Sequence, residues 1–272
     1  MDNRWNWLTQ AMAAMPGQVS CWYKNLKTGE TFGYQENAVH SSASTIKTFL
    51  MAFLFQKFRE GALHPEERIP LRPEQIAPSA GVLSYLRDCR ELSIRDLIEL
   101  MIIVSDNSAT NVLIDLAGKD ALNAFLKEDL GLTCTRLRRH MMDLDAIARG
   151  QDNTTSALEA GLILERMHQG TLVSPEASRE MLRVLKHQQD SSLIPWYLDD
   201  YLPEHTIAHK TGGLDHVLHD AALIDQPDQP YILCFFGSGV SVPDYGRLIQ
   251  DASFRIWRTL REDAEKHASE NV

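Results

Sequence analysis

The sequence predicts an α+β fold in which one antiparallel sheet is built from both ends of the chain and a helical lobe is inserted between them. Strand-like runs lie near the N-terminus and return after residue 205, while roughly residues 44–190 are helical in pattern. The 272 residues, 44% of them hydrophobic, suffice for one domain with a large core. We expect a single domain over 1–272, with an α/β lobe at about 1–36 and 195–272 and an all-α lobe at about 37–194.

The N-terminal part begins with a helix and a hairpin. A short helix is expected over Arg4 to Met15, and Pro16-Gly17 ends it. The runs Val19 to Leu26 and Thr31 to Tyr34 have the residue types of strands and are separated by a short polar turn. These two strands form the first edge of the predicted sheet.

The C-terminal part supplies the remaining strands and a covering helix. Strand-like runs lie at Thr206 to Lys210, Val217 to Ile224 and Tyr231 to Phe236. After Pro243 a single apolar stripe predicts a helix; it comprises Tyr245, Leu248, Ile249, Ala252, Ile256 and Leu260. The mostly polar segment from Arg261 to Val272 is expected to fray.

Composition excludes several classes of function. With 27 basic and 37 acidic residues the net charge is −10, so we expect no nucleic-acid partner, and no apolar run approaches the length of a membrane span. The segment Met1 to Trp7 lacks the apolar core of a signal peptide, so the protein is either cytoplasmic or, if a signal was removed, periplasmic or secreted. The cysteines form no C-x-x-C pair. We expect a monomer without a cofactor, acting on a small molecule.

Three short motifs carry the chemistry. Ser44-Thr45-Ile46-Lys47, Ser105-Asp106-Asn107 and Lys210-Thr211-Gly212 occur in this order, with 61 residues from Ser44 to Ser105 and 105 from Ser105 to Lys210. A second K-T-G, Lys27-Thr28-Gly29, falls between the N-terminal strands and is interpreted as a hairpin turn. The three motifs together predict a serine enzyme that attacks an activated amide.

Local sequence places the nucleophile and its base on one helix. Ser44 lies where a polar stretch meets a run that is apolar almost all the way round a helix, which Gly61 ends. At this N-terminus, free backbone N–H groups favour a developing oxyanion. Lys47 follows one turn later on the same face, where desolvation would lower its pKa and make it a base.

The S-D-N motif ends an amphipathic helix. Its apolar stripe comprises Ile94, Leu97, Ile98, Met101 and Ile102, and Ser105 continues this stripe on the face toward the core. Asp106 is expected to cap the following helix or to brace the turn.

The motifs and their intervals resemble those of the class A β-lactamases, within the penicillin-recognising serine hydrolases, and the resemblance runs across nearly the whole chain. It implies a β-lactamase/transpeptidase-like fold with the site in the crevice between the lobes. It also implies that β-lactam amides are opened through an acyl-Ser44 intermediate. In this chemistry Lys47 activates Ser44, Ser105 protonates the leaving nitrogen, and Asn107 holds the substrate amide and the lysine.

The K-T-G strand would bind the substrate. The resemblance implies that Lys210 and Thr211 hold a carboxylate and that Gly212 lets the substrate backbone approach closely. The amides of Ser44 and Gly213 would form the oxyanion hole. Tyr85 is expected beside the crevice, where it either stacks on substrate or serves packing.

Counted from Lys210, His219 falls where many class A enzymes place an arginine for the substrate carboxylate, and we hypothesise that His219 replaces it. The alternative is a strand histidine hydrogen-bonded to its neighbours. The histidines around it, with Asp215 and Asp220, lack any recognised metal-binding spacing, so we expect no metal.

The resemblance breaks at the loop from Thr135 to Asp145. Class A enzymes deacylate with a glutamate there, and alignment puts Met141 at its position, where a thioether cannot take a proton from water. Asp143 and Asp145 are candidates for a replacement base, and ion pairs with the arginines of the same loop are the alternative. Without a base the acyl-enzyme is long-lived.

The leading hypothesis is therefore a class A-like serine β-lactamase, in which deacylation is slow unless Asp143 or Asp145 supplies the missing base. The alternatives are a D-Ala-D-Ala peptidase, a small ester or amide hydrolase, or a penicillin-binding receptor that is acylated without turnover.

Overall fold

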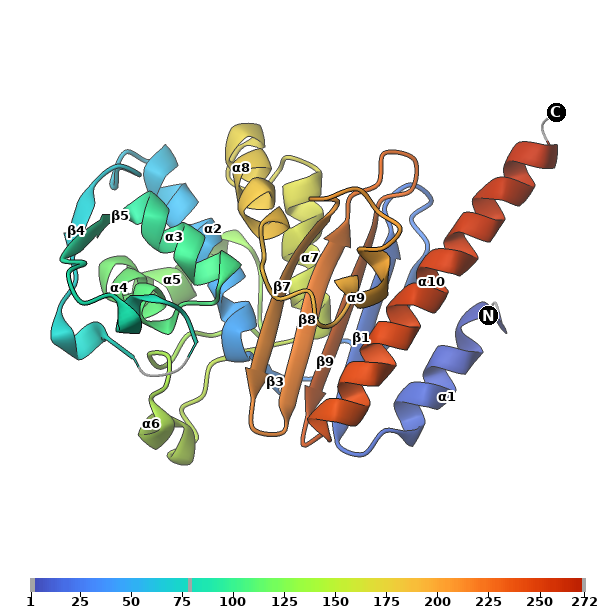
Figure 1. Cartoon of the computed structure of the whole chain (residues 1–272), viewed down its shortest axis with the longest axis horizontal. Coiled ribbons are helices and arrows are strands. Elements are labelled where there is room, and N and C mark those ends of the chain that lie inside the picture. Colours follow the sequence, from blue (N-terminus) through green and yellow to red (C-terminus); the bar gives the residue numbers. More distant parts are fainter. Residues whose placement is uncertain (1–2, 78–79, 271–272) are drawn as a thin grey trace.

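The computed structural model describes residues 3–77 and 80–270 and contains one five-stranded antiparallel sheet. Its strand order is β2-β1-β9-β8-β7, with β1 at Gln18–Asn25, β2 at Thr31–Tyr34, β7 at Ile207–Leu214, β8 at Val217–Ile224 and β9 at Tyr231–Ser238. The N-terminal hairpin pairs with the C-terminal strands through β1 and β9. This confirms the predicted sheet built from both chain ends (Figure 1).

Each face of the sheet is covered by a different set of helices. The terminal helices α1 (Asn6–Ala14) and α10 (Val242–Glu270) lie on one face, and the helical lobe lies on the other (Figure 1). Alternation along β9 supplies both cores: Leu233 and Phe235 pack toward the terminal helices, while Cys234 and Phe236 pack toward the lobe. The α+β fold is the predicted one.

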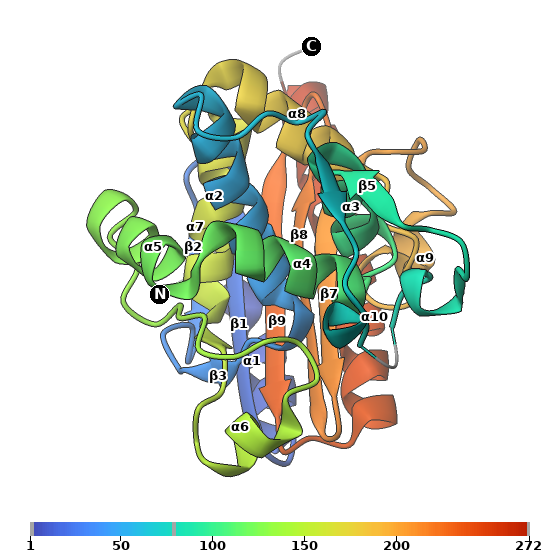
Figure 2. The same cartoon turned by 90° about the vertical axis from the view of Figure 1, so that its left-hand side faces the viewer.

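The helical lobe is built from short helices around α2. Figure 2 shows α2 and α4 in front of the sheet, and α7 packs directly on β1, β8 and β9. The helices after the N-terminal hairpin are α2 (Ile46–Arg59), α3 (Ile94–Ile103), α4 (Asn107–Ala117), α5 (Lys119–Ala124), α6 (Leu144–Ala148), α7 (Ala157–His168), α8 (Pro175–Lys186) and α9 (Pro195–Leu198). Within the described ranges, no helix is long and apolar enough to cross a membrane.

The lobe also contains short strands and turns that the sequence did not predict. One strand pair joins β3 (His40–Ser41) to β6 (Thr154–Thr155), and the other joins β4 (Arg68–Pro70) to β5 (Glu91–Ser93). Strands of two or three residues are too short for a detectable alternation of side chains. The remaining turns are η1 (Asn3–Trp5), η2 (Ala43–Thr45), η3 (Pro73–Gln75), η4 (Leu83–Tyr85) and the π-turn η5 (Phe125–Asp129).

The predictions for the turn and the C-terminus have opposite outcomes. Lys27-Thr28-Gly29 is a hairpin turn as predicted, because the Asn25 side chain accepts hydrogen bonds from the N–H groups of Lys27 and Thr28 at 2.9 and 3.0 Å. The prediction that the chain frays from Arg261 is wrong as far as Glu270, where α10 ends, and the last two residues of that predicted segment lie outside the described residues. Ion pairs one turn apart, such as Arg261 with Glu265 at 3.1 Å, support this polar end of the helix.

Candidate active site

The predicted nucleophile lies in a turn fixed from two sides. Ser44 is the middle residue of η2, directly before α2, and Ala43 before it has a left-handed φ of +44°. Thr45 donates to the carbonyl of Ser42 from both its N–H and its hydroxyl. The Ser42 N–H in turn donates to Asn153, next to β6. Ser44 is thus held in a tight turn at the N-terminal end of α2, where the sequence places it.

Lys47 is fully buried and is held by the S-D-N motif. Its Nζ lies 2.7 Å from the backbone carbonyl oxygen of Ser105, 3.0 Å from Ser105 Oγ and 2.8 Å from Asn107 Oδ1. Burial lowers the pKa of Lys47 well below its usual value, the charge of Lys210 lowers it further, and Asp106 opposes the shift. This shift favours the neutral, basic form of the amine over its charged form.

A strained backbone brings the Ser105 groups to Lys47. Ser105 follows α3 with a φ of +55°, a conformation that costs a non-glycine residue roughly 1 kcal/mol or more. Asp106 then caps α4 by accepting from the Ala109 N–H at 2.9 Å. The local bends thus point both the carbonyl and the hydroxyl of Ser105 at one amine.

Asp106 also braces the neighbouring loop. Its second carboxylate oxygen accepts from the N–H groups of Val82 and Leu83 at 2.6 and 2.8 Å. Gly81 allows this approach, because its φ is +111° and a Cβ there would lie 2.2 Å from Asp106 Oδ2. The two roles proposed as alternatives for Asp106 both occur. Tyr85, at the end of η4, is 77% exposed, so it does not serve core packing.

The strand β7 brings the K-T-G residues against the nucleophile turn. A Cβ at Gly212 would lie 3.1–3.2 Å from Thr45 Cγ2, the Ser42 carbonyl oxygen and the Ser44 nitrogen. Thr211 is largely buried and Gly213 is the next residue in the strand. A side chain at position 212 would therefore push the strand away from Ser44.

Lys210 is a second buried cation near Lys47. Its side chain is 1% exposed, and its Nζ donates to the carbonyl of Thr211 at 3.0 Å. Burial lowers the pKa of Lys210 to about 8, although the carboxylates of Asp190 and Asp220 favour the charged form. Four elements thus bring the predicted site residues into one region. They are η2 with Ser44, α2 with Lys47, the α3–α4 turn with Ser105 and Asn107, and β7 with the K-T-G residues.

Comparison with known proteins agrees with this geometry. Residues 4–260 match the family described as the beta-lactamase enzyme family. The chain belongs to this family.

Two curated beta-lactamases illustrate the sequence relationship. Beta-lactamase L2 of Stenotrophomonas maltophilia is 29% identical over 191 residues, which cover 69% of this chain and 58% of that protein. A beta-lactamase of Rhodobacter capsulatus is 27% identical over 162 residues, or 59% of this chain and 55% of that protein. The chain thus matches less than two thirds of the length of either relative.

Solved structures cover the fold more completely. PBP-A superimposes with a TM-score of 0.86 at 28% identity, covering 96% of this chain and 97% of that chain. A beta-lactamase from Sphaerobacter thermophilus DSM 20745 superimposes with a TM-score of 0.85 at 30% identity, covering 95% and 98%. An acyl-enzyme complex of a PBP-A mutant with penicillin G gives a TM-score of 0.85 at 29% identity, covering 96% and 97%.

In this beta-lactamase family member, His219 does not have the expected position. It is fully buried, its ring stacks on Phe236 with the centroids 4.4 Å apart, and burial lowers its pKa to about 3. Nδ1 accepts from the Gly237 N–H at 3.1 Å, and Nε2 donates to the Ser41 carbonyl at 2.7 Å. Both ring nitrogens are occupied in a neutral imidazole, so the structure contradicts a carboxylate contact and fits a strand histidine bonded to its neighbours.

The loop that departs from the family pattern is anchored by α4. Met141 is buried, its N–H donates to Asn111 Oδ1 at 2.7 Å, and its carbonyl accepts from Asn111 Nδ2 at 3.4 Å. Asn111 lies four residues after Asn107 on the same helix. No sequence motif marked Asn111 as a site residue, although this spacing places it one turn from the S-D-N motif.

Among the described residues, neither Asp143 nor Asp145 makes the ion pairs with loop arginines that were considered as an alternative. Asp143 caps α6 by accepting from the Ala146 N–H at 2.9 Å, and Asp145 is exposed on that helix. The buried Arg139 instead pairs with Asp152 at 2.7 Å. In the part of the chain that the structure describes, neither aspartate hydrogen-bonds to Ser44, Lys47 or Ser105, and no cluster of side chains has metal-binding geometry.

A histidine network beneath the nucleophile turn also escaped sequence analysis. His40 is buried and joins Ser20 on β1, 2.7 Å from its Nε2, to Ser238 on β9, 2.9 Å from its Nδ1. Together with His219, it ties the segment before Ser44 to three strands of the sheet. Isolated serines and histidines in strands carry no sequence pattern that would predict these pairs.

Proposed function

We propose that the protein is a serine enzyme of class A β-lactamase type, which β-lactams acylate at Ser44 and which releases the acyl group slowly. The observation that carries this proposal is the buried Lys47 amine, held between Ser105 and Asn107 one turn after Ser44. A lysine without a carboxylate partner in a buried site serves better as a base than as a structural cation.

Acylation begins with the neutral Lys47 amine. Lys47 takes the Ser44 hydroxyl proton while Ser44 Oγ forms a bond to the β-lactam carbonyl carbon. The proton then passes from Lys47 to Ser105, whose Oγ is 3.0 Å away, as Ser105 donates its own proton to the leaving nitrogen. The carbon–nitrogen bond breaks, Lys47 is neutral again, and the product is an ester at Ser44.

The tetrahedral intermediate requires donors for its oxyanion. We assign this role to the N–H groups of Ser44 and Gly213, because β7 approaches the Ser44 nitrogen closely at Gly212. Fixed backbone donors need no reorganisation during the reaction, and loss of one such donor costs about 3–4 kcal/mol in other serine enzymes.

The substrate carboxylate is assigned to Lys210 and Thr211. Lys210 is buried in the strand beside the nucleophile turn, and it retains its charge below about pH 8. A desolvated ammonium attracts a carboxylate more strongly than an exposed one does. His219 is left out of this assignment because both of its nitrogens are occupied.

Slow deacylation follows from the loop at Met141. Hydrolysis of the acyl ester needs a base for water, and a buried thioether cannot provide one. Asn111 holds this position through both backbone groups of Met141, so a shift that brings Asp143 into its place would break both contacts. Asp143 and Asp145 thus have less support as bases than they had from the sequence.

A penicillin-binding function without efficient turnover is the second candidate. The similarity to PBP-A, and to a PBP-A mutant captured as an acyl-enzyme with penicillin G, favours it. A D-Ala-D-Ala peptidase or a small ester or amide hydrolase would use the same residues. Faster processing of a peptide or ester than of a β-lactam would favour these alternatives.

Hydrolysis of a chromogenic cephalosporin tests the proposal. We expect a burst of about one product per enzyme, followed by slow turnover, and no burst from Ser44→Ala. Ser41→Ala is the matched control, because the Ser41 hydroxyl makes no hydrogen bond within the described residues and its backbone carbonyl, which accepts from His219, is kept. Absence of a burst in the wild-type protein would contradict acylation at Ser44.

A further inference from the structure

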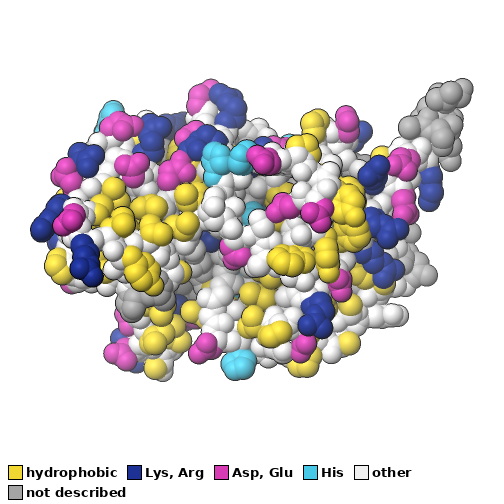
Figure 3. All heavy atoms as spheres, in the orientation of Figure 1, with side chains coloured by type: hydrophobic (Ala, Val, Ile, Leu, Met, Phe, Trp, Pro, Cys, Tyr) yellow, Lys and Arg dark blue, Asp and Glu magenta, His cyan; other side chains and the backbone are white. Residues whose placement is uncertain are grey.

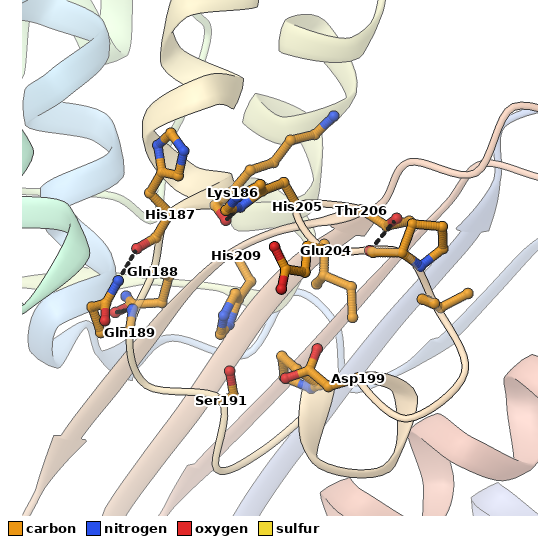
Figure 4. A pocket seen from close by; sticks show the side chains of 14 residues that line it. Lys186, His187, Gln188, Gln189, Ser191, Asp199, Glu204, His205, Thr206 and His209 are labelled. Carbon is orange, nitrogen blue, oxygen red and sulfur yellow. Dashed lines mark hydrogen bonds between the residues drawn. The ribbon is translucent and has the colours of Figure 1, made fainter.

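A cavity lies between α8, α9 and the first half of β7 (Figure 4), and the proposed acylation reaction does not use it. It has a volume of about 350 Å³. Its lining includes Ser191, Asp199, Glu204, His205 and His209. On the surface, histidine side chains gather beside an acidic side chain where α8 approaches β7 (Figure 3). A cavity of this size accommodates a small ligand.

His209 presents one ring nitrogen to this cavity. The residue is only 2% exposed, and its Nδ1 lies 3.0 Å from Asp220 Oδ1. Asp220 is itself fully buried, and its other oxygen accepts from the Ile194 N–H. Because a carboxylate only accepts, Nδ1 carries a proton, and Nε2 is a lone pair when the ring is neutral. Among the described residues Nε2 has no hydrogen-bond partner, and the ring points into the cavity (Figure 4).

The other groups facing the cavity are mainly acceptors. The carboxylates of Glu204 and Asp199 point toward the space beside His209 (Figure 4). Across residues 3–77 and 80–270, neither has an ion-pair partner. His205 Nδ1 donates to the Lys186 carbonyl at 3.1 Å, which leaves its Nε2 as a second lone pair.

The cations nearby do not neutralise these acceptors. Lys186 Nζ pairs with Asp225 at 2.7 Å, and Figure 4 shows its amine directed away from the cavity. His187 Nδ1 is occupied by Arg183 Nη1 at 3.1 Å. The cavity therefore offers two carboxylates and imidazole lone pairs to a ligand that is positively charged and donates hydrogen bonds.

We propose that this cavity binds a primary ammonium group, with Glu204 and Asp199 supplying charge and His209 Nε2 accepting a hydrogen bond at the base. The described side chains include no set with metal-binding geometry, whereas an ammonium carries three donors on a small centre and tolerates more widely spaced acceptors. The proposal does not rest on the acylation reaction at Ser44.

Calorimetric titration of the full-length chain near neutral pH tests the site. The probes are 1,4-diaminobutane, as a free amine, and N-acetyl-lysine amide, as a lysine side chain in a peptide. We expect saturable binding of at least one probe, and the tighter one identifies the source of the ammonium. Glu204→Gln and Asp199→Asn should each weaken binding about tenfold, because each removes a charged hydrogen-bond partner. Glu128→Gln, an exposed carboxylate on η5, should leave binding unchanged.

Four results would overturn the proposal. They are no saturable heat from either probe, equal affinity in the wild-type and both cavity variants, binding of butyrate in place of the amines, and binding of Zn²⁺ that excludes the amines. Both substitutions lie on exposed side chains, so the variants should fold, and their unchanged thermal unfolding would verify this. Substrate turnover is not part of the readout, so this test can fail while the proposed function holds.

Discussion

Lys47 Nζ lies between the two oxygens of Ser105, 2.7 Å from its backbone carbonyl and 3.0 Å from its hydroxyl. This geometry requires the left-handed backbone of Ser105, because both oxygens must face the same side of the turn. The same amine contacts Asn107, so one buried lysine joins the first two motifs into a single proton-transfer unit.

Replacing the base should stop acylation without unfolding the protein. Lys47→Met removes the amine from a fully buried position but keeps an unbranched side chain. We expect the acylation rate to fall by about 10²–10⁴-fold, the range for loss of a general base. Stopped-flow kinetics with a chromogenic cephalosporin measures it. Lys57→Met, on the same helix but outside the site, is the control, and an equal loss there would contradict the assignment.

Binding of a substrate carboxylate should weaken above about pH 8. The pKa of Lys210 is lowered to about 8, so its charge is present below that pH and is lost as the pH rises through it. KM for a β-lactam acid should therefore rise above about pH 8, while KM for its methyl ester should not change. In Lys210→Arg, which stays charged, the rise should disappear. An identical pH profile for acid and ester would contradict a carboxylate contact.

Loss of His219 should affect stability and acylation but not carboxylate recognition. His219→Ala leaves a cavity and an unpaired Gly237 N–H, and we expect it to lower the free energy of unfolding by about 2–4 kcal/mol. The acylation rate should fall equally for a β-lactam acid and its ester, because the change acts through Ser41. Denaturant unfolding measures the first effect, and exposed His64→Ala is its control. If the acylation rate fell only for the β-lactam acid and not for its ester, His219 would contact the substrate carboxylate after all.

A carboxylate at position 141 should accelerate deacylation. Met141→Glu places a base where the loop is already held by Asn111, and we expect the acyl-enzyme to decay about 10²-fold faster. Burial of the new side chain should also lower stability. Met142→Glu is the matched control, because it adds the same charge one residue away. Equal acceleration in both variants, or none in Met141→Glu, would show that position 141 does not limit deacylation.

Spacing and periodicity were sufficient to predict the sheet from both ends, the helix that bears Lys47 and the helix that precedes Ser105. These elements depend on local patterns, namely alternation in strands and apolar stripes in helices. The prediction that the three motifs meet in one site rested on the family resemblance, because local sequence patterns do not show which distant segments lie together.

The details that the sequence could not reveal depend on tertiary contacts. Hydrogen bonds from Lys47, which is 58 positions away in the sequence, offset the conformational cost of the left-handed backbone at Ser105. Backbone groups of Ser41 and Gly237 hydrogen-bond the His219 ring and hold it in the core. A sequence does not show which backbone groups a histidine will bind. Asp143 and Asp145 were considered for their charge and for their places in the aligned loop, whereas the positions of their side chains depend on where α6 begins.

Intact-protein mass spectrometry after mixing with penicillin G tests directly whether Ser44 is acylated and released slowly. We expect an adduct with the mass of one penicillin molecule, which peptide mapping locates on Ser44. This adduct should persist long after the free antibiotic is removed. Ser44→Ala should show no adduct. Absence of an adduct on the wild-type protein would contradict acylation at Ser44, and an adduct that disappears within seconds would contradict slow deacylation.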